Sequence, residues 1–142
     1  MITFKDFRHI IPVQIRFSDI DRLGHVNNAC YHNYIELGRV KYFETVLGDN
    51  VIWDKNGFVL ARTEMDHIEQ VYLNDEIFCC TRVHRFGNKS VGFYNSIIKK
   101  THGGFLECAA VSAVLVAMDY SKNESMTVPA LWRKLISEFE GI

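Results

Sequence analysis

The chain has 142 residues, of which 48% are hydrophobic and 23% are charged, and its formal net charge is -1. This length and apolar content are enough for one domain with its own core. The near-zero charge gives no basic surface of the kind that nucleic-acid binding requires. The sequence therefore predicts a single domain over residues 1–142 that binds no nucleic acid.

The sequence carries no signal for secretion or for a membrane span. Its first seven residues lack the apolar h-region of a secretory signal, and no stretch approaches the roughly 20 uncharged apolar residues of a spanning helix. The 4 cysteines include no CxxC pair. Cys79 and Cys80 are neighbours, so a bridge between them would be strained. We expect reduced thiols, a cytoplasmic protein and no membrane partner.

The first predicted element is a strand. Residues 11–18 alternate apolar and polar side chains, which is typical of a half-buried strand. Its apolar face consists of Ile11, Val13, Ile15 and Phe17. The following segment, residues 19–28, holds two carboxylates, a histidine and two asparagines, and we refer to it as the polar loop.

A long helix is predicted next. Its apolar residues form two stripes at helical spacing, Tyr31, Tyr34, Ile35, Gly38, Tyr42 and Val46, and Leu37, Val40, Phe43 and Leu47. A helix that is apolar over so wide an arc is expected to be largely enclosed. We expect Asn27 or Asn28 to cap its start and residues 48–50 to end it. Glu36 and Arg39 are three residues apart, which predicts an ion pair.

Four long strands and a short helix complete the chain. The strands are expected at residues 58–68, 76–86, 89–100 and 105–118. Turn residues at 87–88 and 103–104 predict two hairpins, and a terminal helix is expected at residues 129–140, with proline near its first turn. Small side chains in the last strand would let a helix approach closely. This order predicts an α+β fold in which one curved antiparallel sheet wraps around one long central helix.

The polar loop reads Asp-Ile-Asp-Arg-Leu-Gly-His-Val-Asn-Asn and is followed by Tyr31, Tyr34 and Glu36. This pattern resembles the hotdog-fold acyl-CoA thioesterases of the 4-hydroxybenzoyl-CoA thioesterase type. The His-Val-Asn-Asn segment also resembles the plant acyl-carrier-protein thioesterases, which share that fold. Residues 86–93 and the tail from Pro129 are similar to the family as well. The resemblance therefore covers nearly the whole chain and implies a hotdog fold and thioester hydrolysis.

The resemblance assigns the central catalytic role to Asp21. Its carboxylate would attack the thioester carbonyl to form a mixed anhydride, or it would hold a water and take its proton. The matching oxyanion donor is the backbone N–H of Asn28, because N–H groups at a helix N-terminus stabilise developing negative charge. The sequence leaves both roles of Asp21 open.

The other polar-loop residues each have two interpretations. Asn27 would orient the thioester or a water, or would cap the helix. His25 would hydrogen-bond Asp21 or gate the pocket, or would fill a partly exposed turn. The position of His25 is apolar in the benzoyl-CoA enzymes, which favours the His-Val-Asn-Asn branch. Asp19 is expected to be structural, since acids two apart on an extended chain point to opposite faces.

Basic residues are candidates for binding the phosphates of coenzyme A. Lys89 and Ser90 match the family's nucleotide-contacting hairpin. Some relatives have two adjacent arginines where this chain has residues 87–88, so Arg82 and Arg85 are the candidates to supply that charge from the preceding strand. The alternative is that this hairpin end is simply solvated.

Two further side chains are candidates for substrate binding. Glu64 lies on a predicted strand that is expected to pass near the start of the helix, although an ion pair with Arg62 or Arg16 is the alternative role. Tyr31 belongs to an aromatic content of 13%, which suits an aromatic or a fatty acyl pocket equally well.

The histidines form no HExxH motif and no Cys/His cluster, so no metal is expected. The resemblance implies no cofactor apart from the coenzyme A of the substrate. It also implies a homodimer that covers the sheet edge, with dimers often paired into a homotetramer. Asp21 of one chain would then work beside residues near Glu64 or Asp66 of another. Two other functions remain, an acyl-carrier-protein thioesterase and a non-catalytic acyl-ligand-binding hotdog protein.

Overall fold

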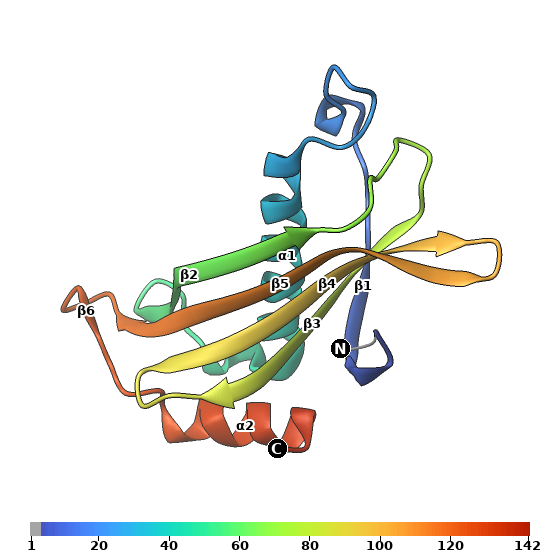
Figure 1. The fold of residues 1–142 in the computed structure, drawn as a ribbon. Coiled ribbons are helices and arrows are strands. Elements are labelled where there is room, and N and C mark those ends of the chain that lie inside the picture. The colour runs from blue at the N-terminus through green and yellow to red at the C-terminus, as the bar shows by residue number, and fades with distance from the viewer. Residues whose placement is uncertain (1–3) are drawn as a thin grey trace.

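The computed structural model describes residues 4–142, which form one antiparallel sheet and two helices. The strands are β1 (His9–Val13), β2 (Asn56–His67), β3 (Ile77–Phe86), β4 (Ser90–Thr101), β5 (Gly104–Asp119) and β6 (Glu124–Ser125). The helices are α1 (Asn28–Val46) and α2 (Ala130–Glu140). Short 3-10 turns lie at Phe4–Asp6, Phe17–Asp19 and Gly48–Asn50. The strand order is β1-β3-β4-β5-β2, and β6 pairs with β5 (Figure 1).

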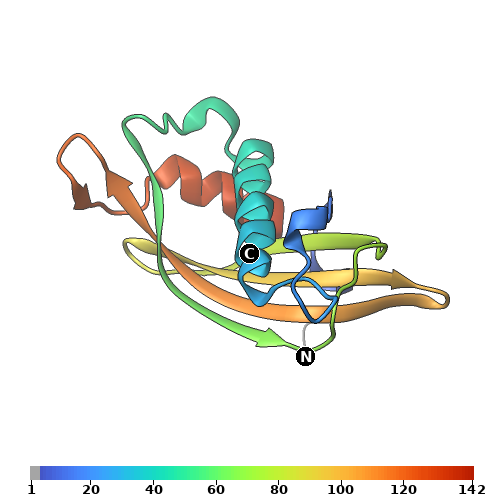
Figure 2. The same cartoon turned by 90° about the horizontal axis from the view of Figure 1, so that it is seen from above.

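The helix α1 crosses one face of this curved sheet (Figure 2). Its 19 residues make it roughly 28 Å long. The buried residues on its sheet-facing side include Tyr31, Tyr34, Ile35, Gly38, Tyr42 and Phe43. Gly38 lies directly against β3, so a Cβ at this position would collide with Cys79 and come within 2.9 Å of the Thr81 hydroxyl. The absence of a side chain at this one position therefore sets how closely the helix approaches the sheet.

The second helix closes the end of the molecule where α1 finishes. Trp132 and Ile136 of α2 are buried against the same aromatic core as Phe43. The indole N–H of Trp132 donates to the carbonyl of Asn50 at 3.0 Å, which ties α2 to the segment that follows α1. None of the described helices is both long and apolar enough to cross a membrane.

Most of the predicted elements are confirmed. Each long strand begins and ends within two residues of its expected limits, and both hairpins turn at the predicted glycines. Asn27 is the N-cap of α1, and Pro129 directly precedes α2. The short strand β6 was not predicted, because two residues are too few to produce a periodic pattern.

The predicted strand over residues 11–18 is wrong in its second half. Pairing with β3 ends at Val13, and Phe17 starts a 3-10 turn with 84% of its surface exposed. The turn is stabilised by Asp19, whose carboxylate accepts the backbone N–H of Arg16 at 3.0 Å. A local side-chain contact therefore outweighs the alternation of apolar residues.

Two expectations for α1 are also wrong within this chain. Leu37 and Val40, from the second apolar stripe, are 41% and 46% exposed, because the sheet covers only one side of the helix. Arg39 is buried and forms no ion pair with Glu36 among residues 4–142. Its Nε has no hydrogen-bond partner in the described structure. The predicted ion pair assumed a solvated helix face, whereas Arg39 is buried.

Candidate functional site

The polar loop contains a tight turn that is closed by a single β-bridge. Ile20 and Val26 form an antiparallel bridge, and the N–H of Asp21 donates to the carbonyl of His25 at 2.9 Å. Gly24 has a φ of 88°, and its N–H donates to the carbonyl of Asp21 at 3.0 Å. Glycine adopts this left-handed φ without steric cost. Gly24 therefore closes the turn that carries Asp21.

The two oxygens of the Asp21 carboxylate have different surroundings. Its Oδ1 accepts the N–H of Leu23 at 2.9 Å, while its Oδ2 lies 3.8 Å from Nδ1 of His25. This second distance suits an ion pair but is too long for a hydrogen bond. The side chain of Asp21 is 24% exposed, so it is open to water and to a ligand. An accessible carboxylate is chemically able to act as a nucleophile or as a base.

The N-terminus of α1 follows at once. Asn27 caps the helix, because its Oδ1 accepts the N–H of Ala29 at 2.9 Å. The N–H of Asn27 donates to the carbonyl of Asp19, and that of Cys30 donates to the carbonyl of Asn27. The N–H of Asn28 has no hydrogen-bond partner within residues 4–142. An open N–H at a helix N-terminus attracts negative charge.

A pocket of about 420 Å³ lies between the polar loop and the end of β2. The loop and helix side of this pocket is formed by Leu23, His25, Val26, Asn28 and Tyr31. The strand side is formed by residues 67–70. The structure therefore brings together three of the predicted site residues, His25, Asn28 and Tyr31, with Asp21 next to His25.

The residues on the strand side of the pocket were not predicted from the sequence. The rings of His67 and Tyr31 make a T-shaped contact, with their centroids 5.0 Å apart. Burial raises the pKa of Tyr31 to about 12. Ile68, Glu69 and Gln70 continue the wall. The sequence signal for these residues was weak, because only the register of β2 against β5 brings its C-terminal end beside the polar loop.

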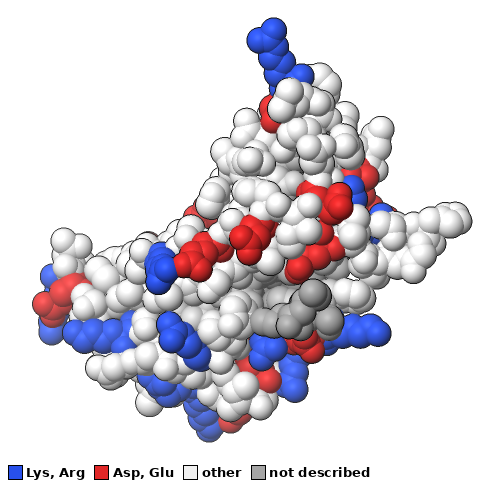
Figure 3. Space-filling model, in the orientation of Figure 1, with Lys and Arg blue, Asp and Glu red and all other residues white. Residues whose placement is uncertain are grey.

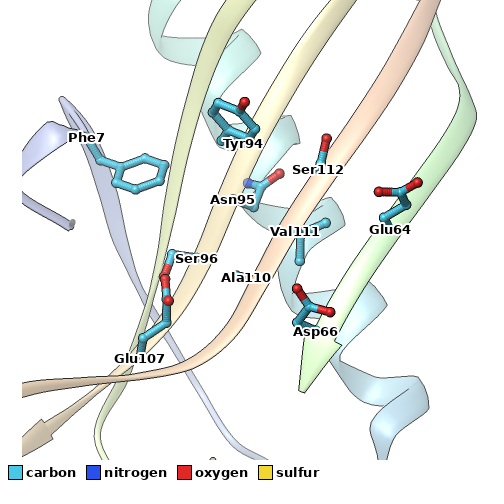
Figure 4. Close-up of a pocket in the computed structure, with 10 residues that line it drawn as sticks. All are labelled: Phe7, Glu64, Asp66, Tyr94, Asn95, Ser96, Glu107, Ala110, Val111 and Ser112. Carbon is cyan, nitrogen blue, oxygen red and sulfur yellow. The ribbon is translucent and has the colours of Figure 1, made fainter. Parts of the chain in front are cut away.

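Glu64 lies away from this pocket. It is on the face of the sheet opposite α1, where it forms an ion pair with Arg62, as the alternative interpretation expected (Figure 4). There it lines a second pocket of about 270 Å³ together with Asp66, Glu107 and Tyr94. Within one chain, Glu64 and Asp66 are therefore separated from Asp21 by the sheet.

The predicted phosphate-binding residues lie at the other end of the molecule. Lys89 lies in the β3–β4 turn and Ser90 is the first residue of β4. The turn packs on α2 through the hydrogen bond from Arg133 to the carbonyl of Gly87 at 2.8 Å. This turn lies near the C-terminal end of α1, whereas the polar loop lies at its N-terminal end (Figure 1). One chain therefore does not bring Lys89 and Ser90 together with Asp21.

The two candidate arginines of β3 have different surroundings. Arg85 lines a small surface pocket with Arg62 and Ser112 on the open face of the sheet. The Nε of Arg82 lies 3.9 Å from a carboxylate oxygen of the buried Glu140, so this arginine is engaged with the C-terminal end of α2. Arg85 is thus the freer of the two.

Charge is unevenly spread over the face drawn in Figure 3. Lys and Arg side chains gather at the lower left, around the β3–β4 turn and α2, and acidic side chains cross the middle of the view over β2. Among the described residues, no group of three or more His, Cys, Asp or Glu side chains is arranged to hold a metal ion.

Comparison with solved structures places this fold among thioesterases. A thioesterase from Thermus thermophilus, solved with coenzyme A and Zn, is 30% identical, with a TM-score of 0.83 over 97% of this chain and 98% of that chain. A mutant 4-hydroxybenzoyl-CoA thioesterase, solved with 4-hydroxybenzoyl-CoA, is 18% identical, with a TM-score of 0.82 over 90% and 97% of the two chains. The predicted hotdog fold is confirmed.

Sequence comparison agrees. The uncharacterized protein YsmA of Bacillus subtilis (strain 168) is 28% identical over 87 residues, which are 60% of this chain but only 57% of YsmA. The family model described as the thioesterase-like superfamily matches residues 15–135, a span that includes the polar loop, α1 and all four long strands. The chain therefore belongs to the thioesterase-like superfamily.

Proposed function

We propose that this protein hydrolyses an acyl-CoA thioester to a free acid and coenzyme A. The proposal rests mainly on the polar loop, which lies beside a pocket at the start of α1. There the carboxylate of Asp21 is partly exposed, and the N–H of Asn28 has no hydrogen-bond partner among the described residues. Family membership supports the same reaction class. As proposed, the reaction is cytoplasmic and needs no cofactor other than the coenzyme A of the substrate.

Asp21 acts on the thioester carbon in one of two ways. As a nucleophile, its carboxylate forms an acyl anhydride and expels the thiolate, and water then hydrolyses the anhydride. As a general base, it takes a proton from the water that attacks the carbonyl carbon, and the tetrahedral intermediate then expels the coenzyme A thiolate, which receives that proton. In both routes, the carbonyl oxygen becomes negatively charged and accepts a hydrogen bond from the backbone N–H of Asn28. Because this N–H lies at the helix N-terminus, the helix dipole stabilises the same negative charge.

Coenzyme A as the leaving group is supported by the relatives solved with coenzyme A and with 4-hydroxybenzoyl-CoA. Lys89, Ser90 and Arg85 would bind its phosphates. Arg82 contributes less in this proposal, since Glu140 already compensates its charge.

The reactive end and the basic end of the substrate site would come from two copies of the chain. β2 is an edge strand that pairs only with β5 in the described sheet. The helix α1 also exposes two apolar side chains, Leu37 and Val40. Antiparallel pairing of two β2 strands would cover this sheet edge. Because β2 runs from the basic end toward the polar loop, such pairing would bring the β3–β4 turn of one copy toward the polar loop of the other.

A carrier-protein thioester is the second candidate substrate. It is favoured by the engagement of Arg82 with Glu140, which leaves the hairpin with fewer free cations for the phosphates of coenzyme A. A non-catalytic acyl-binding role is the third, and the presence of Asp21 in a water-accessible position disfavours it.

Thiol release from a panel of acyl-CoAs and acyl-carrier-protein thioesters tests these candidates. We expect turnover by the wild type and a loss of about 10²–10⁴-fold in Asp21→Ala and Asp21→Asn. Asp54→Asn is the matched control, because Asp54 is an exposed carboxylate between α1 and β2 and is expected to leave the rate unchanged. Full activity of Asp21→Ala would contradict the mechanism, and absence of turnover on every substrate would contradict the function.

A further inference from the structure

Asp19 is a buried carboxylate two residues before Asp21. Only 1% of its surface is exposed, so its charge must be compensated by partners within the protein. The hydroxyl of Tyr34 donates to its Oδ2 at 2.6 Å, and the backbone N–H of Arg16 donates to the same oxygen at 3.0 Å. The guanidinium of Arg16 donates to Oδ1 at 3.1 and 3.3 Å. Both oxygens are occupied, so Asp19 itself has no free oxygen to offer a substrate.

The backbone of Asp19 fixes the other side of the polar loop. Its carbonyl accepts the N–H of Asn27 at 2.8 Å, next to the bridge between Ile20 and Val26. Asp19 thus lies at the base of the turn that carries Asp21 and is bonded directly to the N-cap of α1. Through Tyr34, its side chain also bonds to the second turn of the same helix.

We propose that Asp19 and Tyr34 are positioning residues for the thioesterase reaction, holding the carboxylate of Asp21 at a fixed place relative to the N–H of Asn28. This inference rests on the proposed function. Attack on a thioester requires the nucleophile or the activated water on one side of the carbonyl carbon and the oxyanion donor at its oxygen. A displacement of about 1 Å between such groups can reduce the rate 10²-fold.

The chain provides a matched control on the same helix. Tyr42 lies eight residues after Tyr34, and its hydroxyl donates to the carboxylate of Glu140 at 3.1 Å. Tyr42 and Glu140 are both buried, as Tyr34 and Asp19 are, but they join α1 to α2, at the end of the helix away from the polar loop. Tyr34→Phe and Tyr42→Phe therefore remove the same atom from the same kind of bond.

The experiment measures kcat, KM and thermal unfolding for the wild type, Tyr34→Phe, Tyr42→Phe and Asp21→Ala, on the best acyl-CoA of the panel. We expect both tyrosine variants to unfold at lower temperatures than the wild type. We expect kcat to fall about 10–100-fold in Tyr34→Phe, with KM within about twofold, and to stay unchanged in Tyr42→Phe. Asp19→Asn is a second positioning variant, and its kcat is expected to fall in the same way.

A double variant separates positioning from a general loss of folded protein. If Tyr34 acts through Asp21, then Tyr34→Phe has no further effect on the residual rate of Asp21→Ala. The inference would be overturned if the rate losses of the two single variants multiplied in the double variant. Equal losses of kcat in Tyr34→Phe and Tyr42→Phe would overturn it as well. Full kcat in Tyr34→Phe would overturn it while leaving the function intact, whereas a wild type without turnover would remove the proposed function and this inference together.

Discussion

The pKa values of two buried carboxylates, Asp19 and Glu140, are shifted in opposite directions. Each buried carboxylate accepts a hydrogen bond from a tyrosine of α1. Burial by itself raises the pKa of Asp19, but the hydrogen bonds from Tyr34 and Arg16 outweigh it and hold the pKa below its usual value. For Glu140, burial dominates over Tyr42 and the nearby arginines, and the pKa is raised. Asp19 therefore stabilises the fold as an anion, whereas ionised Glu140 weakens it.

The stability of the two carboxamide variants is expected to depend on pH in opposite directions. The contribution of Asp19 is fully present above its unfolded pKa of about 3.9 and is lost as pH falls through its lower folded value. At pH 7, Asp19→Asn should lower the free energy of unfolding by about 2 kcal/mol, and this deficit should shrink below about pH 4.

Glu140→Gln should show the reverse trend. The stabilising contribution of Glu140 to the free energy of unfolding is present below its unfolded pKa of about 4.3. It is lost as pH rises through the higher pKa of the folded state. Relative to the wild type, Glu140→Gln should therefore gain stability over that rise. Urea unfolding curves between pH 3 and pH 8 measure both variants, and the same trend in both would contradict this assignment.

At the scale of elements, the contact between α1 and β3 depends on one glycine. Alanine in place of glycine normally stabilises a helix by about 1 kcal/mol, but a Cβ at position 38 would overlap Cys79 and crowd Thr81. We expect Gly38→Ala to lower stability by about 1–3 kcal/mol through overpacking. Thermal unfolding is the measurement, with Gly103→Ala as control because a Cβ there meets nothing within 4 Å. Equal stability of the two variants would contradict the role given to Gly38.

The elements themselves were largely predictable. The turn glycines and the Asn27 cap are local signals, and they are confirmed in the β3–β4 and β4–β5 hairpins and at the start of α1. Two predictions failed for different reasons. At Phe17, the local contact of Asp19 with Arg16 forms a 3-10 turn in place of the predicted strand. Leu37 is exposed because no strand of the described sheet covers that side of the helix.

At the scale of the whole molecule, the polar loop and the basic β3–β4 turn occupy opposite ends of one chain (Figure 1). Pairing through β2 is therefore central to the proposed site. We expect the wild type to sediment as a dimer or tetramer and Leu60→Lys, which adds a charge to β2, to sediment as a monomer with reduced thioesterase activity. Leu131→Lys is the control, since Leu60 and Leu131 are both 49% exposed but Leu131 lies on α2. A monomeric wild type would contradict the two-chain site.

The sequence by itself determined the order and approximate limits of the long elements, the two hairpins and the chemical character of the polar loop, because these depend on residues within a few positions of one another. Only the tertiary structure decided that Asp19 is buried on Tyr34, that His67 lies opposite Tyr31, and that Glu64 is on the far face of the sheet. These placements depend on strand register and on how the helix crosses the sheet. They join residues far apart in the chain, and no local pattern of side chains encodes them.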